Sequence, residues 1–103
     1  MEVATVVSKN GILIRLTGER WKHIVLMHQG LAGKQQKILT TIQNPDCILK
    51  GKMGELLAVS KTSKKLYLVV VYKESGDDGF ITAYKTSDTN WLLKKEMIWS
   101  KDS

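Results

Sequence analysis

Residues 66–73, which read LYLVVVYK, restrict the possible folds of this chain more than any other segment does. Nearly every side chain in this run is apolar, which is typical of an inner strand that is covered on both faces. A chain of 103 residues forms one domain, here residues 1–103, and is long enough to bury one small core. The sequence therefore predicts a single domain built around this strand.

Shorter strands and two helices are predicted around the inner strand. The expected strands cover residues 12–16, 47–50, 55–60 and 80–84. Helices are expected at residues 18–29, where Thr17 is a suitable N-cap, and at residues 32–43, which Pro45 terminates. Within the second helical region, an inner stripe of Leu31, Ile38 and Ile42 follows the helical period.

Two helices followed by strands joined through hairpins predict an α+β fold. We expect two N-terminal helices packed on a four- to five-stranded antiparallel sheet. For the tail two interpretations stay open: a turn of helix at residues 91–93, or an edge strand at residues 97–99.

The sequence carries no signature of a membrane, secreted, metal-binding or nucleotide-binding protein. No apolar run approaches the roughly 20 residues of a membrane span, and residues 1–9 do not resemble a secretory signal. Cys47 is the only cysteine, and together with His23 and His28 it is too few for a usual structural zinc site. Gly51 and Gly54 precede a strand instead of a helix, so they form no phosphate loop. We expect a cytoplasmic protein without disulfide, metal, cofactor or membrane association.

The charge of the chain is positive and unevenly distributed. Sixteen lysine and arginine residues against ten acidic residues give a net charge of +6, and residues 47–73 hold six lysines but only one acidic residue, Glu55. Such a segment attracts phosphate backbones, although a solvated lysine-rich surface has the same composition. The lysines expected to bind RNA are Lys50, Lys52, Lys61, Lys64 and Lys65.

Without a metal or nucleotide motif, one reaction fits the histidine, tyrosine, lysine and arginine side chains of the chain. It is RNA cleavage with the RNA's own 2′-hydroxyl as nucleophile. The enzyme then supplies only a base, an acid and a cation for the phosphorane charge. The residues that are candidates for this chemistry are Arg15, Arg20, His23, His28, Thr82 and Tyr84. In the strand at residues 80–84, alternation places Thr82 and Tyr84 on one face, and that face is open if Ile81 and Ala83 face the helices. An exposed aromatic ring and hydroxyl beside a cation suit single-stranded RNA.

Four motifs in order resemble a known nuclease superfamily. They are Arg15-Leu-Thr, the run from Glu19 to His28 that reads ERWKHIVLMH, the segment IQNPD at residues 42–46, and FITAY at residues 80–84. The set resembles the phage-type branch of the barnase–EndoU–colicin–RelE-like nucleases. The resemblance implies a RelE-like fold and metal-independent endoribonuclease activity, often in a toxin or phage-associated protein. It also implies His23 and His28 as helix histidines, Arg15 and Arg20 as a cationic pair, and Thr82 and Tyr84 as sheet residues.

One position departs from that pattern. Gln29 stands after His28 in a Gln-Gly-Leu segment, where many relatives have Pro-Glu-Leu. The acidic group that would orient the histidine is therefore missing.

Two other functions stay open on the same fold. A catalytically silent module would bind RNA through the same lysines, with a strong dependence on salt. A protein-binding component of a toxin–antitoxin or phage complex would use an unpaired sheet edge at residues 47–50 or 97–99 to hold an antitoxin or another protein partner.

Overall fold

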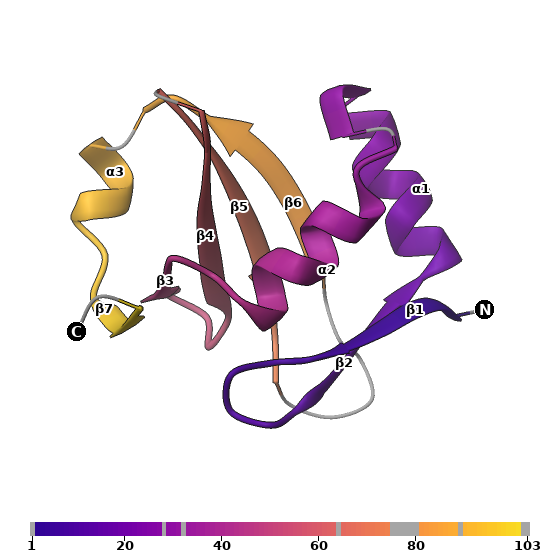
Figure 1. The fold of residues 1–103 in the computed structure, drawn as a ribbon, viewed down its shortest axis with the longest axis horizontal. Helices are drawn as coiled ribbons and strands as arrows, with labels where there is room; N and C mark the ends of the chain where they lie inside the picture. The colour runs from indigo at the N-terminus through magenta and orange to yellow at the C-terminus, as the bar shows by residue number, and fades with distance from the viewer. Residues whose placement is uncertain are drawn as a thin grey trace.

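In the computed structural model, a strongly twisted five-stranded antiparallel sheet carries two helices and a β-hairpin on one face (Figure 1). The structure describes residues 2–27, 29–31, 33–63, 65–74, 81–88 and 90–101. The strands are β1 (Glu2–Val7), β2 (Leu13–Thr17), β3 (Cys47–Lys50), β4 (Leu56–Ser63), β5 (Leu66–Tyr72), β6 (Ile81–Thr86) and β7 (Met97–Ser100). The helices are α1 (Gly18–Met27), the 3-10 turn η1 (Gln29–Leu31), α2 (Gln35–Gln43) and the short α3 (Asn90–Leu93).

The large sheet has the strand order β6-β5-β4-β3-β7, and every neighbouring pair is antiparallel. The predicted α+β class and antiparallel sheet are thus confirmed. Strand β5 is an inner strand, and Leu68, Val69 and Val70 at its centre are fully buried although they point alternately to opposite faces. The expectation drawn from the apolar run is confirmed.

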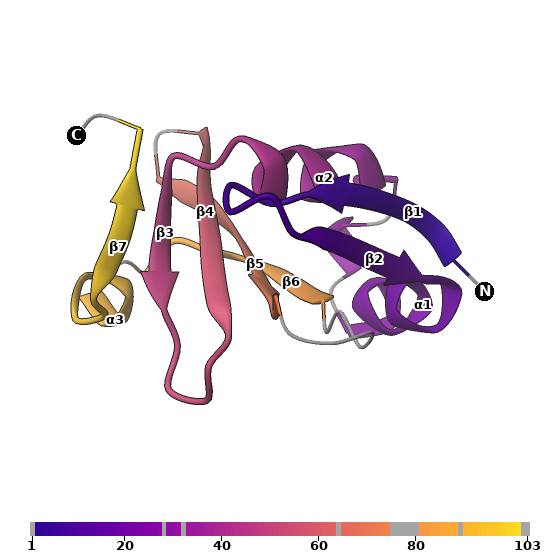
Figure 2. The same cartoon turned by 90° about the horizontal axis from the view of Figure 1, so that it is seen from below.

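The prediction of two N-terminal helices is wrong, because a β-hairpin precedes them. Strands β1 and β2 form a separate two-stranded sheet, joined by a turn in which Gly11 has a φ of 79°. Val6, Ile14 and Leu16 of this hairpin are buried in the core next to α1 and α2. Figure 2 shows the hairpin lying beside α2, with α1 following directly from β2. Residues 2–7 alternate too weakly to indicate a strand without their β2 partner.

Both main helices begin and end close to the predicted residues. The backbone N–H of Arg20 donates a 3.2 Å hydrogen bond to the hydroxyl of Thr17, which confirms Thr17 as the N-cap of α1. Helix α2 begins at Gln35, because η1 and a turn at Gly33 occupy the preceding residues. The inner stripe of Leu31, Ile38 and Ile42 is buried as expected.

The main core lies between the sheet and these helices. It contains Ala58, Leu68, Val70, Tyr72 and Ala83 from the sheet, and α1 contacts β6 while α2 contacts β4 and β5. We call this side of the sheet the first face. No helix among the described residues is long and apolar enough to cross a membrane.

The tail contains both elements that the sequence left as alternatives. Residues 90–93 form α3, and residues 97–100 form β7, which pairs with β3. Of the two alternatives for an unpaired edge, residues 47–50 and 97–99, the second is the edge strand, because β3 has a partner on each side and β7 lies at the end of the sheet. Asp46 helps to hold β7 in place: its carboxylate lies 2.8 Å from Lys101 Nζ and accepts a 2.8 Å hydrogen bond from the Lys61 N–H.

Candidate nucleic-acid interface

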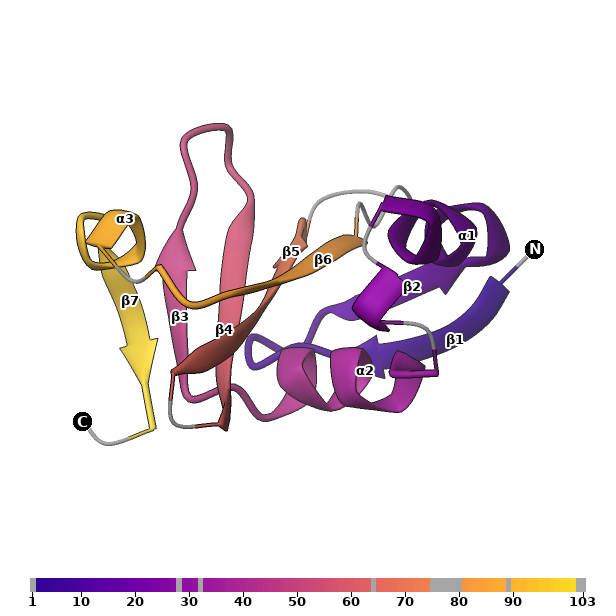
Figure 3. The same ribbon diagram turned by 90° about the horizontal axis from the view of Figure 1, so that it is seen from above.

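The side of the sheet opposite α1 and α2, which we call the second face, carries a small apolar cluster and several polar side chains. In Figure 3 the short helix α3 and strand β7 lie at one end of the molecule, and α1 and α2 lie at the other. Strand alternation and the pairing register assign to the second face Cys47, Leu49, Leu57, Val59, Lys61, Tyr67, Val69, Val71, Thr82, Tyr84 and Thr86. Leu92 of α3 packs on Leu49, Leu57, Val59 and Val69.

Thr82 and Tyr84 lie on the second face, as the alternation in their strand predicts. Ala83 between them is fully buried against the helices, whereas Tyr84 packs at the edge of the second-face cluster. Thr82 and Tyr84 are both half-buried. Phe80, the first residue of the predicted strand, lies outside the described residues. A tyrosine hydroxyl is protonated at neutral pH and can donate a hydrogen bond, and burial raises the pKa of Tyr84 further from neutrality.

A second tyrosine, which sequence reasoning missed, lies next to Tyr84. Tyr67 on β5 is directly opposite Thr86 on β6, and Tyr84 precedes Thr86 by two residues on the same strand. Tyr67 and Tyr84 are therefore diagonal neighbours on one face, at a separation that aromatic side chains span, about 7–8 Å. The position of Tyr67 in the alternation of residues 66–72 is the signal that could have identified it.

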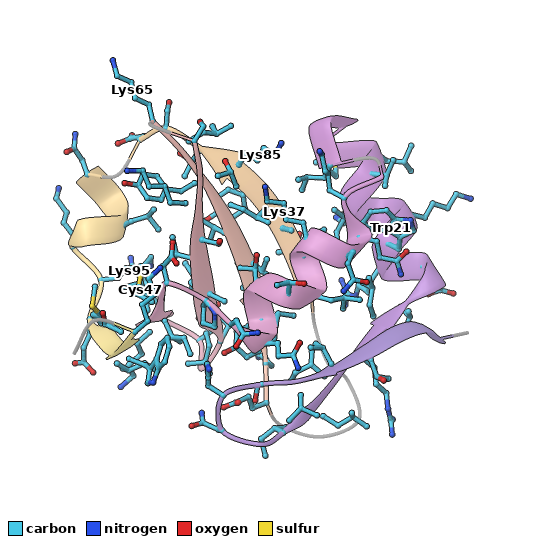
Figure 4. All side chains as sticks on the ribbon, viewed as in Figure 1. Trp21, Lys37, Cys47, Lys65, Lys85 and Lys95 are labelled. Carbon is cyan, nitrogen blue, oxygen red and sulfur yellow. The ribbon has the colours of Figure 1, made fainter. Side chains whose placement is uncertain are left out.

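An apolar pocket opens on the second face beside Tyr67. Its volume is about 300 Å³, and it is lined by Cys47, Leu49, Val59, Tyr67, Leu92, Lys95 and Met97. Figure 4 shows Lys95 next to Cys47 at the end of the sheet where α3 and β7 lie. Burial, and secondarily the negative charge of Asp46, raise the pKa of the Cys47 thiol, so it is a neutral wall of the pocket.

The predicted RNA-binding lysines do not form one patch. Lys50 and Lys52 are exposed at the β3–β4 turn, whereas Lys61 and Lys65 are exposed toward the β4–β5 turn. Lys50 pairs with Leu56 at the start of β4, and Lys61 is five residues further along that strand, a distance of about 17 Å. Lys61 is directly opposite Tyr67 and thus belongs to the second face. Lys64 lies outside the described residues.

Two further lysines add positive charge at the other end of the second face. The carboxylate of Glu55 accepts a 2.8 Å hydrogen bond from the Met53 N–H, and this bond together with the nearby Lys73 and Lys95 lowers its pKa. One carboxylate faces two ammonium groups, so this cluster has a net charge of +1. Sequence reasoning gave no role to Lys95, because only the packing of the tail brings it beside β3 and β4.

The candidates in the N-terminal part of the chain lie away from the second face. His23 and Arg20 are exposed on α1, and Arg15 is half-buried on β2, opposite Thr5. Helix α1 packs against the first face of β6, whereas Thr82 and Tyr84 point to the second face of the same strand. The structure therefore separates His23, Arg15 and Arg20 from Thr82 and Tyr84. His28 lies outside the described residues.

Within the described part of the chain, no three His, Cys, Asp or Glu side chains are grouped closely enough to bind a metal ion. The second face instead combines hydroxyls, aromatic rings and ammonium groups. These groups can stack on bases and neutralise phosphates.

The chain matches no protein-family model, no curated protein and no solved structure in the comparisons.

Proposed function

We propose that this chain is a cytoplasmic, RelE-like protein that binds single-stranded RNA across the second face and cleaves it without a metal ion. The observation that carries the proposal is the row of half-buried side chains Tyr67, Tyr84 and Thr82 on the second face, next to Lys61. Single-stranded RNA exposes unpaired bases that stack on aromatic rings, and its phosphates bind lysines. The ordered motifs shared with RelE-like nucleases support the same function.

The reaction is attack of the RNA's 2′-hydroxyl on the adjacent phosphate, which leaves a 2′,3′-cyclic phosphate and a free 5′-hydroxyl. Tyr84 is protonated at neutral pH, so in this proposal it donates its proton to the leaving 5′-oxygen. Thr82 positions the scissile nucleotide, and Lys61 neutralises charge at the phosphate. In this proposal the 2′-hydroxyl gives its proton to a water molecule, because His23 lies on the α1 side of the sheet and cannot reach the phosphate that Tyr84 contacts. Arg15 and Arg20 can hold phosphates further along the RNA where it passes around the edge strand β6.

Cleavage of a labelled mixed-sequence RNA in EDTA tests the proposal, with product ends analysed for 2′,3′-cyclic phosphate. Tyr84→Phe removes only the hydroxyl and is expected to reduce the cleavage rate by about 10²-fold or more while RNA affinity is retained. Tyr67→Phe is the matched control on the neighbouring strand, since it keeps the stacking ring, and it is expected to leave both rate and affinity unchanged.

His23→Ala, compared with its exposed neighbour Lys22→Ala, tests whether the helix histidine takes part in cleavage. Both variants are expected to cleave at the parent rate, and loss of cleavage in the His23 variant alone would overturn the placement of the reaction beside Tyr84. Intact RNA in the presence of salt-sensitive binding identifies the alternative, a catalytically silent RNA-binding module.

A protein-binding function is the second candidate, because β7 is an exposed edge strand. Met97 and Ile98 are 53% and 44% exposed, and the outer side of β7 has no strand partner among the described residues. An extended segment of an antitoxin or another protein could add a strand there, and an acidic segment would complement the net charge of +6. A stable complex together with no measurable RNA affinity would favour this function over the first.

A further inference from the structure

The pocket on the second face begins where the tyrosine row ends. Tyr67 belongs to both, since it is the diagonal neighbour of Tyr84 and also a wall of the pocket. The opposite wall is formed by Leu92 and Met97, which come from the tail of the chain. A strand of RNA that follows the row from Tyr84 to Tyr67 therefore reaches the mouth of the pocket.

The size and lining of the pocket suit a small, flat and mainly apolar group. Its volume of about 300 Å³ is at the lower limit of usual ligand sites, which suits one nucleobase better than a larger molecule. The walls are aliphatic, apart from the ring of Tyr67, the thiol of Cys47 and the side chain of Lys95. A base has a flat face for the tyrosine and the aliphatic walls, and edge atoms that accept hydrogen bonds from an ammonium group.

The charge around the pocket favours a ligand that carries a phosphate. Lys95 lines the pocket, and the cluster of Lys73, Lys95 and Glu55 has a net charge of +1. Lys61 is directly opposite Tyr67 on β4 and adds a further positive charge near the ring. A neutral apolar ligand would gain nothing from these lysines, whereas a nucleotide uses both the walls and the charge.

We propose that this pocket takes one unstacked nucleobase of the bound RNA, with Tyr67 against its face and Lys95 beside the adjoining phosphate. The inference rests on the proposed RNA-binding function and adds to it the place where a single base is held. A pocket that holds one base fixes the register of the RNA on the second face, and it selects among bases by their shape.

Cys47 provides a direct test, because it lines the pocket and is the only cysteine of the chain. The rate of Cys47 alkylation by iodoacetamide is measured by intact mass at mildly alkaline pH, with and without a 2′-O-methyl RNA oligonucleotide that cannot be cleaved. Binding of the oligonucleotide is measured separately by fluorescence anisotropy. If a base fills the pocket, alkylation slows about tenfold once about nine tenths of the protein is bound, because only the open fraction reacts. An abasic oligonucleotide of the same length brings the same phosphates but no bases, and it is expected to leave the rate unchanged.

A pair of variants on β7 tests the same point by affinity. Met97→Trp fills the mouth of the pocket with a larger side chain at a position that is already 53% exposed, so folding is retained. Ile98→Trp makes the same change at the next residue, which does not line the pocket. Only Met97→Trp is expected to weaken RNA binding, by about tenfold, and to leave affinity for the abasic oligonucleotide unchanged.

The outcomes separate this inference from the proposed function. RNA that binds tightly while Cys47 reacts at its free rate overturns the base pocket and leaves the RNA-binding function intact. Equal effects of the two tryptophan variants overturn it in the same way. No binding of RNA at all overturns the proposed function, and the base pocket with it.

Discussion

Replacement of Tyr72 by phenylalanine is expected to stabilise this protein. Tyr72 is fully buried at the end of β5, where its ring packs in the core between the sheet and the helices. Its hydroxyl has no hydrogen-bond partner among the described residues. The described residues therefore remove this hydroxyl from water without replacing its hydrogen bonds, and Tyr72→Phe deletes this group while keeping the ring.

The magnitude follows from the cost of burying an unpaired hydroxyl. Mutational data place that cost at about 1–3 kcal/mol. Part of the gain is lost because the space left by the oxygen is not refilled, so we expect an increase of about 1–2 kcal/mol in the free energy of unfolding. Each kcal/mol corresponds to an increase of about 4–8 °C in the melting temperature of a domain of this size.

The buried hydroxyl of Tyr72 also makes the stability of the protein depend on pH in the alkaline range. Burial, and secondarily the charge of Glu74, raise the pKa of Tyr72 above its ordinary value. The unfolded chain therefore loses the Tyr72 proton at about pH 10 while the folded state retains it, so stability falls as the pH rises above that value. The phenylalanine variant lacks this group, and its advantage over the parent protein grows above about pH 10.

Urea denaturation at neutral pH and at pH 10–11 measures both effects. Tyr67→Phe is the matched control, because Tyr67 is half-buried and solvent can reach its hydroxyl, so its change is expected to stay within about 0.5 kcal/mol. A loss of more than about 1 kcal/mol in Tyr72→Phe would refute the reasoning, since it would mean that the hydroxyl is hydrogen-bonded in the folded protein.

Three further predictions concern local features of the fold. Partial burial acts to raise the pKa of Asp46, but the hydrogen bonds from Lys101 and from a backbone N–H outweigh it and lower the pKa. Its contribution to stability is therefore present above about pH 4 and lost as the pH falls further, so Asp46→Asn should be less stable near pH 7 and equal to the parent at low pH; a pH-independent difference would contradict this. Thr17→Ala removes the N-cap of α1 and should cost about 1 kcal/mol in urea denaturation, and no change would show that the cap contributes nothing. Gly54→Ala should cost about 1–2 kcal/mol, because Gly54 has a φ of 87°, whereas Gly30→Ala has open space and no such φ; equal losses would rule out backbone strain as the cause.

Local patterns in the sequence determined most of the elements. The apolar run of residues 66–73 predicted an inner strand, and β5 is covered on both faces. Thr17 predicted the start of α1, and Leu31, Ile38 and Ile42 predicted the buried stripe around α2. These features depend on spacing within one turn of helix or one strand, so they can be seen without knowing what each element packs against.

The arrangement of the elements required the tertiary structure. The pairing of β3 with β7 joins residues about fifty positions apart, and no local pattern shows that the tail covers that edge. The same pairing decides which of the two candidate edges, residues 47–50 or 97–99, is unpaired, and it brings Lys95 and Met97 to the pocket beside Cys47.

For the candidate site too, the sequence predicted the local relations between residues, and the tertiary structure decided the long-range ones. Alternation within one strand was enough to predict the shared face of Thr82 and Tyr84, because that relation is local. The lysines at positions 50–65 are close in sequence but lie at the two ends of β4, because an extended strand carries neighbouring residues far apart. The sequence by itself determined which residue types are present and which face of its own strand each occupies. The long-range pairing of strands decided which of them meet, because the free energy of that pairing depends on the packing of the whole domain.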